Sequence, residues 1–325
     1  MQRNLTFAGA ILAAFSSGMV NAQAPTQYPV KAIRVIVPSA PGSGPDIMAR
    51  TIAQKLSEVL SQPVIVEARP GAGGIIGSEA AAKSSPDGYT LIMGNAGSHS
   101  VNPSLYRKLP YDPLKDFAPV TLVSTAPNIL IVHPSLPVKS VKDLISLAKA
   151  RPGDLTFGSG GNGSTAHLSG EMFRTLAGIN LVHVPFKGAP AAVLGVITGE
   201  ISMAILNLPP ALPHVKSGRL KALGVSTPKR SAAVPDMPTI AESGLPGYSA
   251  TAWYGVLAPT GTPREIILKL NTEIVKILRT DEIKKRISSD GGEVIGSTPE
   301  EFTAVMKSDI AKWAKVVQAS GARVD

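Results

Sequence analysis

Short β-branched runs alternate with amphipathic stretches along most of the chain. The run AIRVIVP (32–38) is followed by helical spacing over 47–60, and PVIVEAR (63–69) by helical spacing near 76–84, before the third apolar run TLIMG. An order of strand, loop, helix and strand is typical of parallel βαβ units. The first part of the chain is therefore predicted to form an open α/β sheet.

The same alternation restarts after the long apolar stretch PVTLVSTAPNILIVHP. The segments that follow it are a helix at 140–150, a strand at 155–159, a helix at 164–178, strands at 181–186, 201–206 and 220–226, a strand at 251–259, and two or three charged amphipathic helices. Gly178 stands where a helix commonly ends in the left-handed conformation. A second α/β unit is thus predicted, inserted between two parts of the sequence that form the first.

This layout predicts two α/β lobes joined by two crossover segments. The crossovers are placed near 121–127 and 247–253. Lobe I is then discontinuous and comprises 25–125 plus 250–325, while lobe II comprises 126–249. A chain of this length can bury two separate cores.

The first 24 residues have the layout of a secretory signal peptide. Arg3 precedes a short apolar stretch, and Ala22-Gln23-Ala24 forms a small-x-small cleavage sequence. The apolar run is short for a bilayer span and is interrupted by Ser and Gly, which favours a cleaved peptide over a membrane anchor. Cleavage is predicted after Ala24, with the remaining chain exported to the periplasm.

Composition narrows the classes of function. The chain has no cysteine, so neither disulfides nor thiolate metal sites are expected. Its formal net charge of +9 favours attraction of anions. Aromatic residues make up only 5%, and no basic cluster is interleaved with them, which argues against nucleic acid as a partner.

Three glycine-rich loops lie between a predicted strand and a predicted helix, at 41–46, 71–74 and 158–165. Ligands bind at this edge of open α/β sheets, where helix N-termini leave backbone N–H groups unpaired. Glycine lets those groups approach a carboxylate or phosphate closely. Binding is favoured over simple helix capping for the first and third loops, while the second loop remains open between the two. For Asp46 the capping role is favoured, since its carboxylate would repel an anion.

Catalytic patterns are weak. Gly158-x-Gly160-x-x-Gly163 matches a dinucleotide fingerprint, but no acidic residue ends the next strand, and a diffusible dinucleotide is scarce outside the cytoplasm. The sequence contains no G-x-S-x-G elbow, and its five histidines show no metal-ligand spacing. We therefore expect no enzyme, cofactor or metal. His167 is left open between reaching the cleft and packing, and Trp253-Tyr254 is interpreted as a core pair.

Several motifs together resemble the substrate-binding proteins of tripartite tricarboxylate transporters, also called Bug receptors. The motifs are YPVKAIRVIVPSAPGSGPDIMAR, PVIVEARPGAGGIIGSEAAAKSSPDGYTL, FGSGGNGSTAHLSGEMF, HVPFKGAPAAV, MPTIAESGLPGY and WYGVLAPTGTP. The resemblance implies a type II periplasmic binding protein fold whose two lobes close on a small organic carboxylate. It also implies a monomer that docks on a membrane permease or, in some members, on a signalling protein.

The resemblance further implies that two loops, 38–46 and 158–165, grip a ligand carboxylate from opposite lobes through backbone amides and ordered water. The residues expected to bind ligand are Ser39, Ala40, Pro41, Gly42, Ser43, Gly44, Asp46, Asn95, Ser98, Ser159, Gly160, Gly163, Ser164, Thr165, His167, Lys187, Gly188 and Ala189. Ser43 stands where the family often has a second glycine and keeps a hydroxyl donor. Phe186 stands where tyrosine is frequent, a loss of a hydroxyl that alters which ligand is preferred.

Overall fold

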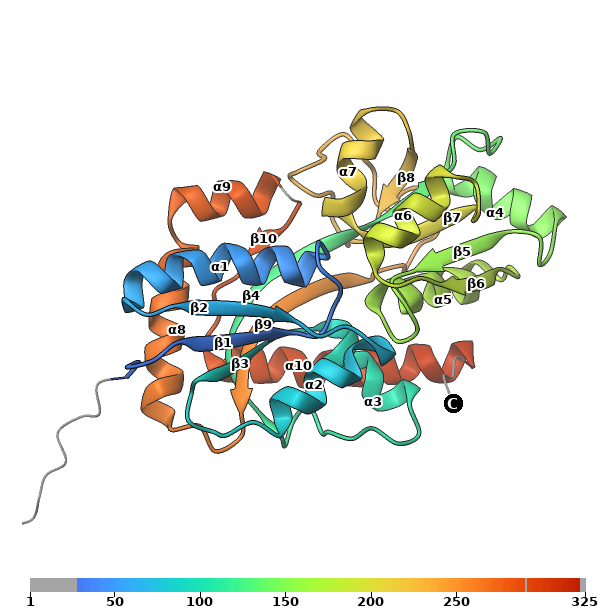
Figure 1. The fold of residues 1–325 in the computed structure, drawn as a ribbon. Coiled ribbons are helices and arrows are strands. Elements are labelled where there is room, and N and C mark those ends of the chain that lie inside the picture. Colours follow the sequence, from blue (N-terminus) through green and yellow to red (C-terminus); the bar gives the residue numbers. More distant parts are fainter. Residues whose placement is uncertain (1–27, 290, 322–325) are drawn as a thin grey trace, which may run out of the picture.

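The computed structural model describes residues 28–289 and 291–321 (Figure 1). The predicted signal peptide lies outside these residues. Ten strands form one sheet with the order β2-β1-β3-β9-β4-β7-β5-β6, to which β8 and β10 add on β4. Within the described ranges, no helix is both long enough and apolar enough to cross a lipid bilayer.

The first half of the sheet is built from parallel strands, as the alternation of strands and helices predicts. β1 pairs in parallel with both β2 and β3. The strands and helices of this half are β1 (Ile33–Val37), α1 (Gly44–Leu60), β2 (Val64–Ala68), η1 (Ala72–Gly74), α2 (Ile75–Ala82), β3 (Thr90–Asn95), η2 (Gly97–Val101), α3 (Asn102–Leu105), α8 (Arg264–Leu278) and α9 (Asp281–Ser289).

The second half repeats the arrangement, with β5 parallel to both β6 and β7. Its strands and helices are α4 (Val141–Ala150), β5 (Thr156–Ser159), α5 (Thr165–Ala177), β6 (Val182–Pro185), α6 (Ala189–Ile197), β7 (Met203–Asn207), α7 (Leu208–Lys216) and β8 (Lys221–Val225). Gly178 ends α5 with a left-handed φ of 60°, as predicted.

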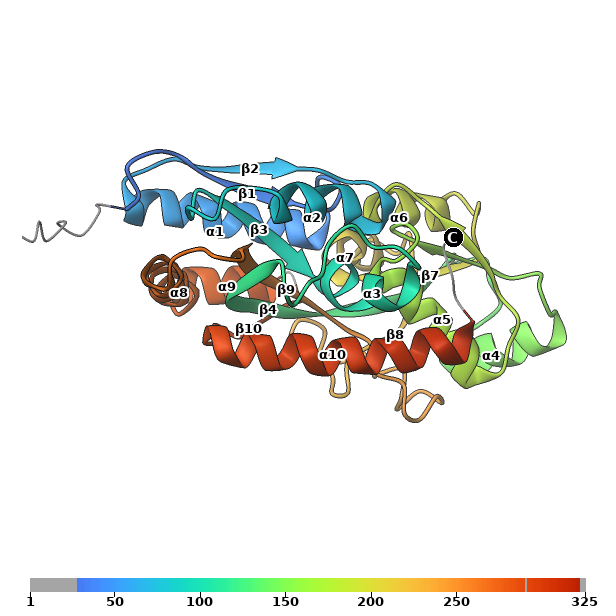
Figure 2. The ribbon, with the colours of Figure 1, turned by 90° about the horizontal axis from the view of Figure 1, so that it is seen from below.

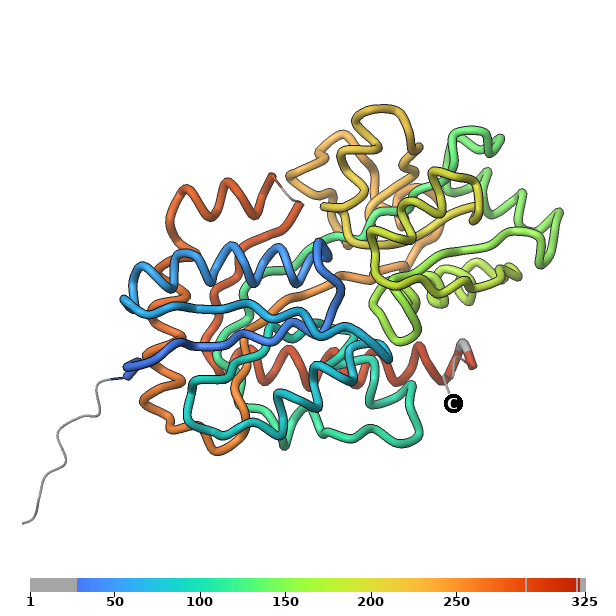
Figure 3. The backbone as a smooth tube through the Cα atoms, in the orientation of Figure 1, coloured from blue at the N-terminus to red at the C-terminus, as the bar shows by residue number. Residues whose placement is uncertain are grey.

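Two antiparallel strands, β4 (Phe117–Val132) and β9 (Thr251–Pro259), carry the chain from one half to the other and back (Figure 3). β4 pairs with β9 as far as Pro127↔Thr251, and from Asn128 onward it pairs with β7 and β8 instead. A short strand, β10 (Glu293–Val294), adds to β4 beside this change of partner.

The change of partner is held by a buried amide. Asn128 Nδ2 donates to Ser169 Oγ (3.0 Å) and to the Ala250 carbonyl (3.2 Å), while its Oδ1 accepts from Asn207 Nδ2 (3.0 Å). A buried side-chain amide must satisfy both of its ends, so this network fixes where β4, β7 and α5 meet.

The long C-terminal helix α10 (Pro299–Ser320) runs beneath both halves (Figure 2). Phe302 and Met306 near its start pack into a core of the first half, whereas Trp313 and Val317 pack into the core formed by α4, α5 and β5. Its start is fixed by a capping box between Thr298 and Glu301. The helix therefore ties the two halves together from one side.

The helices differ from the sequence predictions in two ways: one starts earlier than predicted, and two were not predicted. α1 begins at Gly44, three residues before the predicted 47, because Ser43 is the N-cap and Pro45 fits the first turn. α6 and α7 were not predicted. α6 is apolar on almost every face, and α7 contains Pro209, Pro210 and Pro213, so neither shows the periodicity of a half-buried helix.

Candidate binding site

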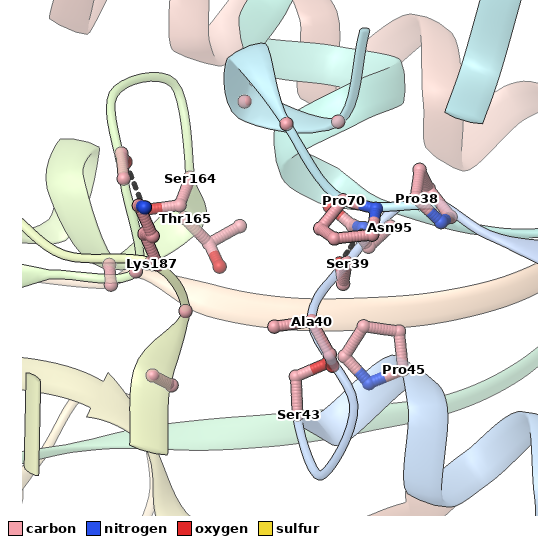
Figure 4. Close-up of a pocket in the computed structure, with 18 of the residues that line it drawn as sticks. Pro38, Ser39, Ala40, Ser43, Pro45, Pro70, Asn95, Ser164, Thr165 and Lys187 are labelled. Atoms are coloured by element: carbon pink, nitrogen blue, oxygen red, sulfur yellow. Dashed lines mark hydrogen bonds between the residues drawn. The ribbon is translucent and has the colours of Figure 1, made fainter. Parts of the chain in front are cut away.

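A cavity of about 620 Å³ lies between the two halves, at the ends of the strands. Figure 4 shows the loops that face each other across it. From the first half it is lined by Pro38, Ser39, Ala40, Ser43, Pro45, Pro70, Gly71, Ala72, Gly73, Gly74, Asn95, Tyr106 and Tyr254. From the second half it is lined by Gly160, Gly161, Asn162, Ser164, Thr165, Ala166, Phe186, Lys187, Gly188, Ala189 and Asn207.

Helices α1, α2, α5, α6 and α7 begin at this cavity, α2 directly after the lining residue Gly74. α1 starts one residue after Ser43, α5 starts at Thr165, α6 at Ala189 and α7 directly after Asn207. The first turn of a helix leaves backbone N–H groups without intrahelical partners and carries a partial positive charge. Their convergence makes the cavity suited to a negatively charged group.

The loop before α1 is shaped by its own hydrogen bonds. Ser43 Oγ donates to the Ala40 carbonyl (2.6 Å), and Asp46 Oδ2 accepts from Gly42 N–H (2.9 Å) and from Arg50 Nε (3.1 Å). Asp46 is buried behind the loop and lies in the first turn of α1, so the N-cap role predicted for it belongs to Ser43. The carboxylate holds the loop and keeps its charge out of the cavity.

In the loop before α5, one residue, Ser164, both caps the helix and lines the cavity. Ser164 accepts from His167 N–H (3.2 Å) as the N-cap and donates through Oγ to the Gly161 carbonyl (2.7 Å). Behind it, Ser159 Oγ accepts from Gly161 N–H (3.1 Å). The choice between helix cap and binding residue at Ser164 is therefore not exclusive, since it caps α5 and also borders the cavity.

A stacked pair of histidines supports this loop from below. The rings of His167 and His183 lie 4.0 Å apart, and His167 Nδ1 accepts from Gly163 N–H (3.3 Å). Burial lowers the pKa of His167 to about 3 and the pKa of His183 to about 4, and the neighbouring His183 further lowers that of His167. His167 thus packs as a neutral ring and does not border the cavity.

We predict that this pair makes stability depend on pH. Because the folded-state pKa of His167 is lowered, the unfolded chain binds the extra proton first, and stability is lost as pH falls from about 6.5 toward 3. In His167→Gln the free energy of unfolding, measured in urea at a series of pH values, should depend less steeply on pH in that window, by about 1 kcal/mol per pH unit. The control is Thr175→Ala, an exposed residue of α5 without a titratable side chain, which should keep the wild-type slope. An unchanged slope in His167→Gln would contradict the prediction.

The predicted binding residues divide into two sets. Those that border the cavity are Ser39, Ala40, Ser43, Asn95, Gly160, Ser164, Thr165, Lys187, Gly188 and Ala189. The others do not line it: Gly44, Asp46, Ser98, Ser159, Gly163 and His167 are buried, and Pro41 and Gly42 are exposed. For all of them, contact with a ligand remains a prediction.

The end of β3 and the turn after it show how a predicted residue that does not line the cavity can support one that does. Asn95 borders it and donates from Nδ2 to Ser39 Oγ at 3.4 Å (Figure 4). Ser98 is buried, donates its N–H to Asn95 Oδ1 (3.1 Å) and contacts His99 Nδ1 through Oγ (2.8 Å). Ser98 therefore orients Asn95 from within the core.

Several lining residues were not predicted. The second glycine loop, which the sequence left open between binding and structure, contributes Pro70–Gly74. Asn162 lies within the predicted loop 158–165 but was not among the residues expected to bind, and Tyr106 and Asn207 line the cavity without a motif that marks them. The reading of Trp253-Tyr254 as a core pair fits Trp253, which packs on Phe302 at 5.3 Å, but Tyr254 borders the cavity as well.

Tyr254 carries a polar atom without a partner. Its residue is 2% exposed, and its hydroxyl makes no hydrogen bond to any described residue. Burial raises the pKa of this hydroxyl, so it stays protonated and can donate. A buried unsatisfied hydroxyl is costly, and such groups in native structures commonly mark a function.

The charge of the lining is one-sided. Among the described residues that border the cavity, Lys187 is the one charged side chain, and none is Asp or Glu. With Lys187, the helix N-termini and the Thr165 hydroxyl, the site offers hydrogen-bond donors and positive potential. An anion with several oxygen acceptors fits this chemistry.

Comparison with known proteins finds sequences similar to this chain along its length. The model of the tripartite tricarboxylate transporter family receptor matches residues 48–322. Protein BugT of Bordetella pertussis is 37% identical over 325 residues, which is 100% of this chain and 99% of that protein.

Two solved structures are similar over almost the whole fold. Rpa4515 of R. palustris, determined with adipate, is 39% identical with a TM-score of 0.89 and covers 91% of this chain and 100% of its own. MatC of Rhodopseudomonas palustris, determined with bound malate, is 32% identical with a TM-score of 0.85 and covers 89% of this chain and 100% of its own. The predicted periplasmic binding protein fold with two α/β lobes is confirmed.

Proposed function

Because the chain belongs to the tripartite tricarboxylate transporter receptor family, a family of solute-binding proteins, we propose that it captures a small organic dicarboxylate outside the cytoplasm and delivers it to a membrane permease. The observation that carries the proposal is the cavity between the two halves, where Lys187 is the one charged side chain among the described lining residues and the N-termini of α1, α2, α5, α6 and α7 surround the space. The adipate and malate of the two similar structures support a ligand of about this size and charge.

Capture follows from contacts that both halves make around the ligand. A Cβ added to Gly188 would lie 2.7 Å from Ala40 Cβ, and one added to Gly73 would lie 2.5 Å from the Asn162 carbonyl oxygen. Each pair joins one half to the other, so the loops approach as closely as backbone allows. We propose that these contacts form when lobes divided near β4 and β9 close, and that ligand shifts this equilibrium by binding the closed state more tightly.

The proposal is tested by ligand binding to the purified chain. Isothermal titration and thermal unfolding with succinate, malate, adipate and citrate should show saturable binding and a rise in melting temperature with at least one of the dicarboxylates. Native mass spectrometry of the protein as purified would reveal a retained carboxylate. Absence of binding across the panel, together with no retained ligand, would overturn the proposal.

Removing the unpaired hydroxyl of Tyr254 should change the affinity for ligand and the stability of the protein in opposite directions. In Tyr254→Phe we expect affinity for the dicarboxylate to fall about tenfold, since one buried hydrogen bond to a charged group is lost. The ligand-free protein should be as stable as wild type or more stable, because the unsatisfied buried hydroxyl is removed. Calorimetry and urea unfolding measure the two effects, and Tyr28→Phe, whose hydroxyl binds the Gly88 carbonyl away from the cavity, is the control. A Tyr254→Phe protein that binds normally would show that the hydroxyl faces no ligand.

A further inference from the structure

A second cavity, of about 810 Å³, lies where the chain passes between the two halves, and it shares no lining residue with the first. Its floor includes Thr125–Pro127 of β4 and Thr251 of β9. One wall is the segment after β8, residues 227–232, and the other is formed by the ends of α8 and α9 with β10. Figure 1 shows α9 and the segment after β8 approaching each other near β10.

The two walls are in direct contact at one point. Ser231 Oγ donates to the Gly291 carbonyl at 3.5 Å, joining the segment after β8 to the chain that follows α9. β10 is fixed against the floor, with Glu293 opposite Thr125 on β4. Backbone pairing and this hydrogen bond therefore hold the two walls and the floor of the groove in place.

Four cations line this groove, two from each wall. Lys229 and Arg230 come from the segment after β8, and Arg279 and Lys284 come from the region of α8 and α9. Glu293 is the one acid among the described lining residues, and Asp290 lies outside the described residues.

The positive charge is largely uncompensated. Arg230 pairs with Glu242 at 3.0 Å, outside the lining. Lys229, Arg279 and Lys284 form no ion pair within 4.0 Å with the part of the chain that the structure describes. Three unpaired cations around a concave surface focus positive potential, and hydroxyls of Thr227, Ser231 and Ser288 add donors.

We propose that this groove is a second anion site, which takes a small multivalent anion such as a polyphosphate or polycarboxylate across its two walls. The chemistry favours a multivalent ligand because the cations come from opposite sides and one monovalent group reaches only part of them. Oxygen-rich anions match the lysine and arginine donors and the neighbouring hydroxyls.

The position of the groove links it to ligand capture. Since its two walls belong to different halves, a change in the angle between the halves alters the distance between the cations. An anion that bridges them therefore favours one angle, and its binding is coupled to that of the ligand in the first cavity. This coupling rests on the proposed function, whereas the anion site does not.

Inorganic pyrophosphate is the probe for the site. Isothermal titration with the whole exported chain, at about 150 mM salt to screen exposed charges, should show one saturable site. Lys284→Gln and Arg279→Gln should each weaken binding about tenfold. The matched control is Lys285→Gln, which alters the next residue of α9 outside the groove.

Two results would overturn the site. One is no saturable pyrophosphate binding, and the other is an equal loss in Lys285→Gln, which would show attraction to the general surface charge. Lys187→Gln in the first cavity should leave pyrophosphate binding intact, so failure of the dicarboxylate proposal is recognised separately. For the coupling, the dicarboxylate affinity should change in saturating pyrophosphate in wild type and not in Arg279→Gln. An unchanged wild-type affinity would overturn the coupling.

Discussion

In Gly188→Ala the affinity for the dicarboxylate should fall about tenfold to a hundredfold. Gly188 has φ 98° and ψ 162°, a conformation that residues with a Cβ rarely adopt, and its new Cβ would lie 2.7 Å from Ala40 Cβ in the opposite half. Overpacking of this kind costs about 1–3 kcal/mol. It raises the free energy of the closed state, in which the two loops touch, and leaves that of the open state unchanged. Isothermal titration of the variant measures the loss.

The chain offers a control that separates backbone strain from the contact between halves. Gly199, which follows α6 in the same half, also has a positive φ of 76°, but a Cβ there would meet no atom within 4 Å. Gly199→Ala should therefore lose some stability, about 1 kcal/mol, and keep the wild-type affinity. If both variants lost affinity equally, strain within the second half would explain the effect, and the proposed closure contact would be wrong.

In Trp313→Ala the free energy of unfolding should fall by about 3–5 kcal/mol. Trp313 is fully buried where α10 packs against the second half, and its indole Nε1 donates to Asp309 Oδ2 at 3.1 Å. The same carboxylate oxygen accepts from Trp253 Nε1 at 2.9 Å, so the truncation leaves a cavity beside a shared acceptor. Urea unfolding followed by circular dichroism measures the change.

Lys315→Ala is the matched control for Trp313→Ala, since Lys315 is exposed on the same helix. Its free energy of unfolding should stay within about 0.5 kcal/mol of wild type. A Trp313→Ala protein that unfolds in two separate steps would show that α10 couples the two halves. A loss below about 1 kcal/mol would contradict the packing described for this helix.

The glycine loops were the most informative part of the sequence. Their position between strand and helix depends on local periodicity and on the conformational freedom of glycine, both of which can be read along the chain. Ten of the eighteen residues expected to bind ligand border the cavity in the structure. Of the other eight, Pro41 and Gly42 are exposed, and six are buried, among them Asp46 and Ser98, whose hydrogen bonds shape the loops.

Tyr254 shows what local patterns miss. In the sequence it reads as a core aromatic residue, and its ring is indeed buried in the first half. The missing partner of its hydroxyl is visible only in the tertiary structure, where β9 lies between β3 and β4 and Tyr254 borders the cavity. A pattern of apolar positions indicates that a tyrosine side chain is buried. It does not indicate whether the hydroxyl oxygen of that side chain has a hydrogen-bond partner.

The second, basic cavity is a stronger example. Its cations stand at 229–230, 279 and 284, and in the sequence they read as scattered surface charge. They become neighbours because β4 exchanges partners at Asn128 and β9 returns the chain to the first half.

The sequence by itself determined the class of fold, the alternation of strands and helices, and the loops that present helix N-termini, because each depends on contacts between residues close in the chain. Tertiary structure alone decided which residues from the two halves face each other, since sheet order and the path of β4 and β9 bring together segments far apart in sequence. The starts of α6 and α7 at the cavity, the free hydroxyl of Tyr254 and the basic groove all follow from that placement.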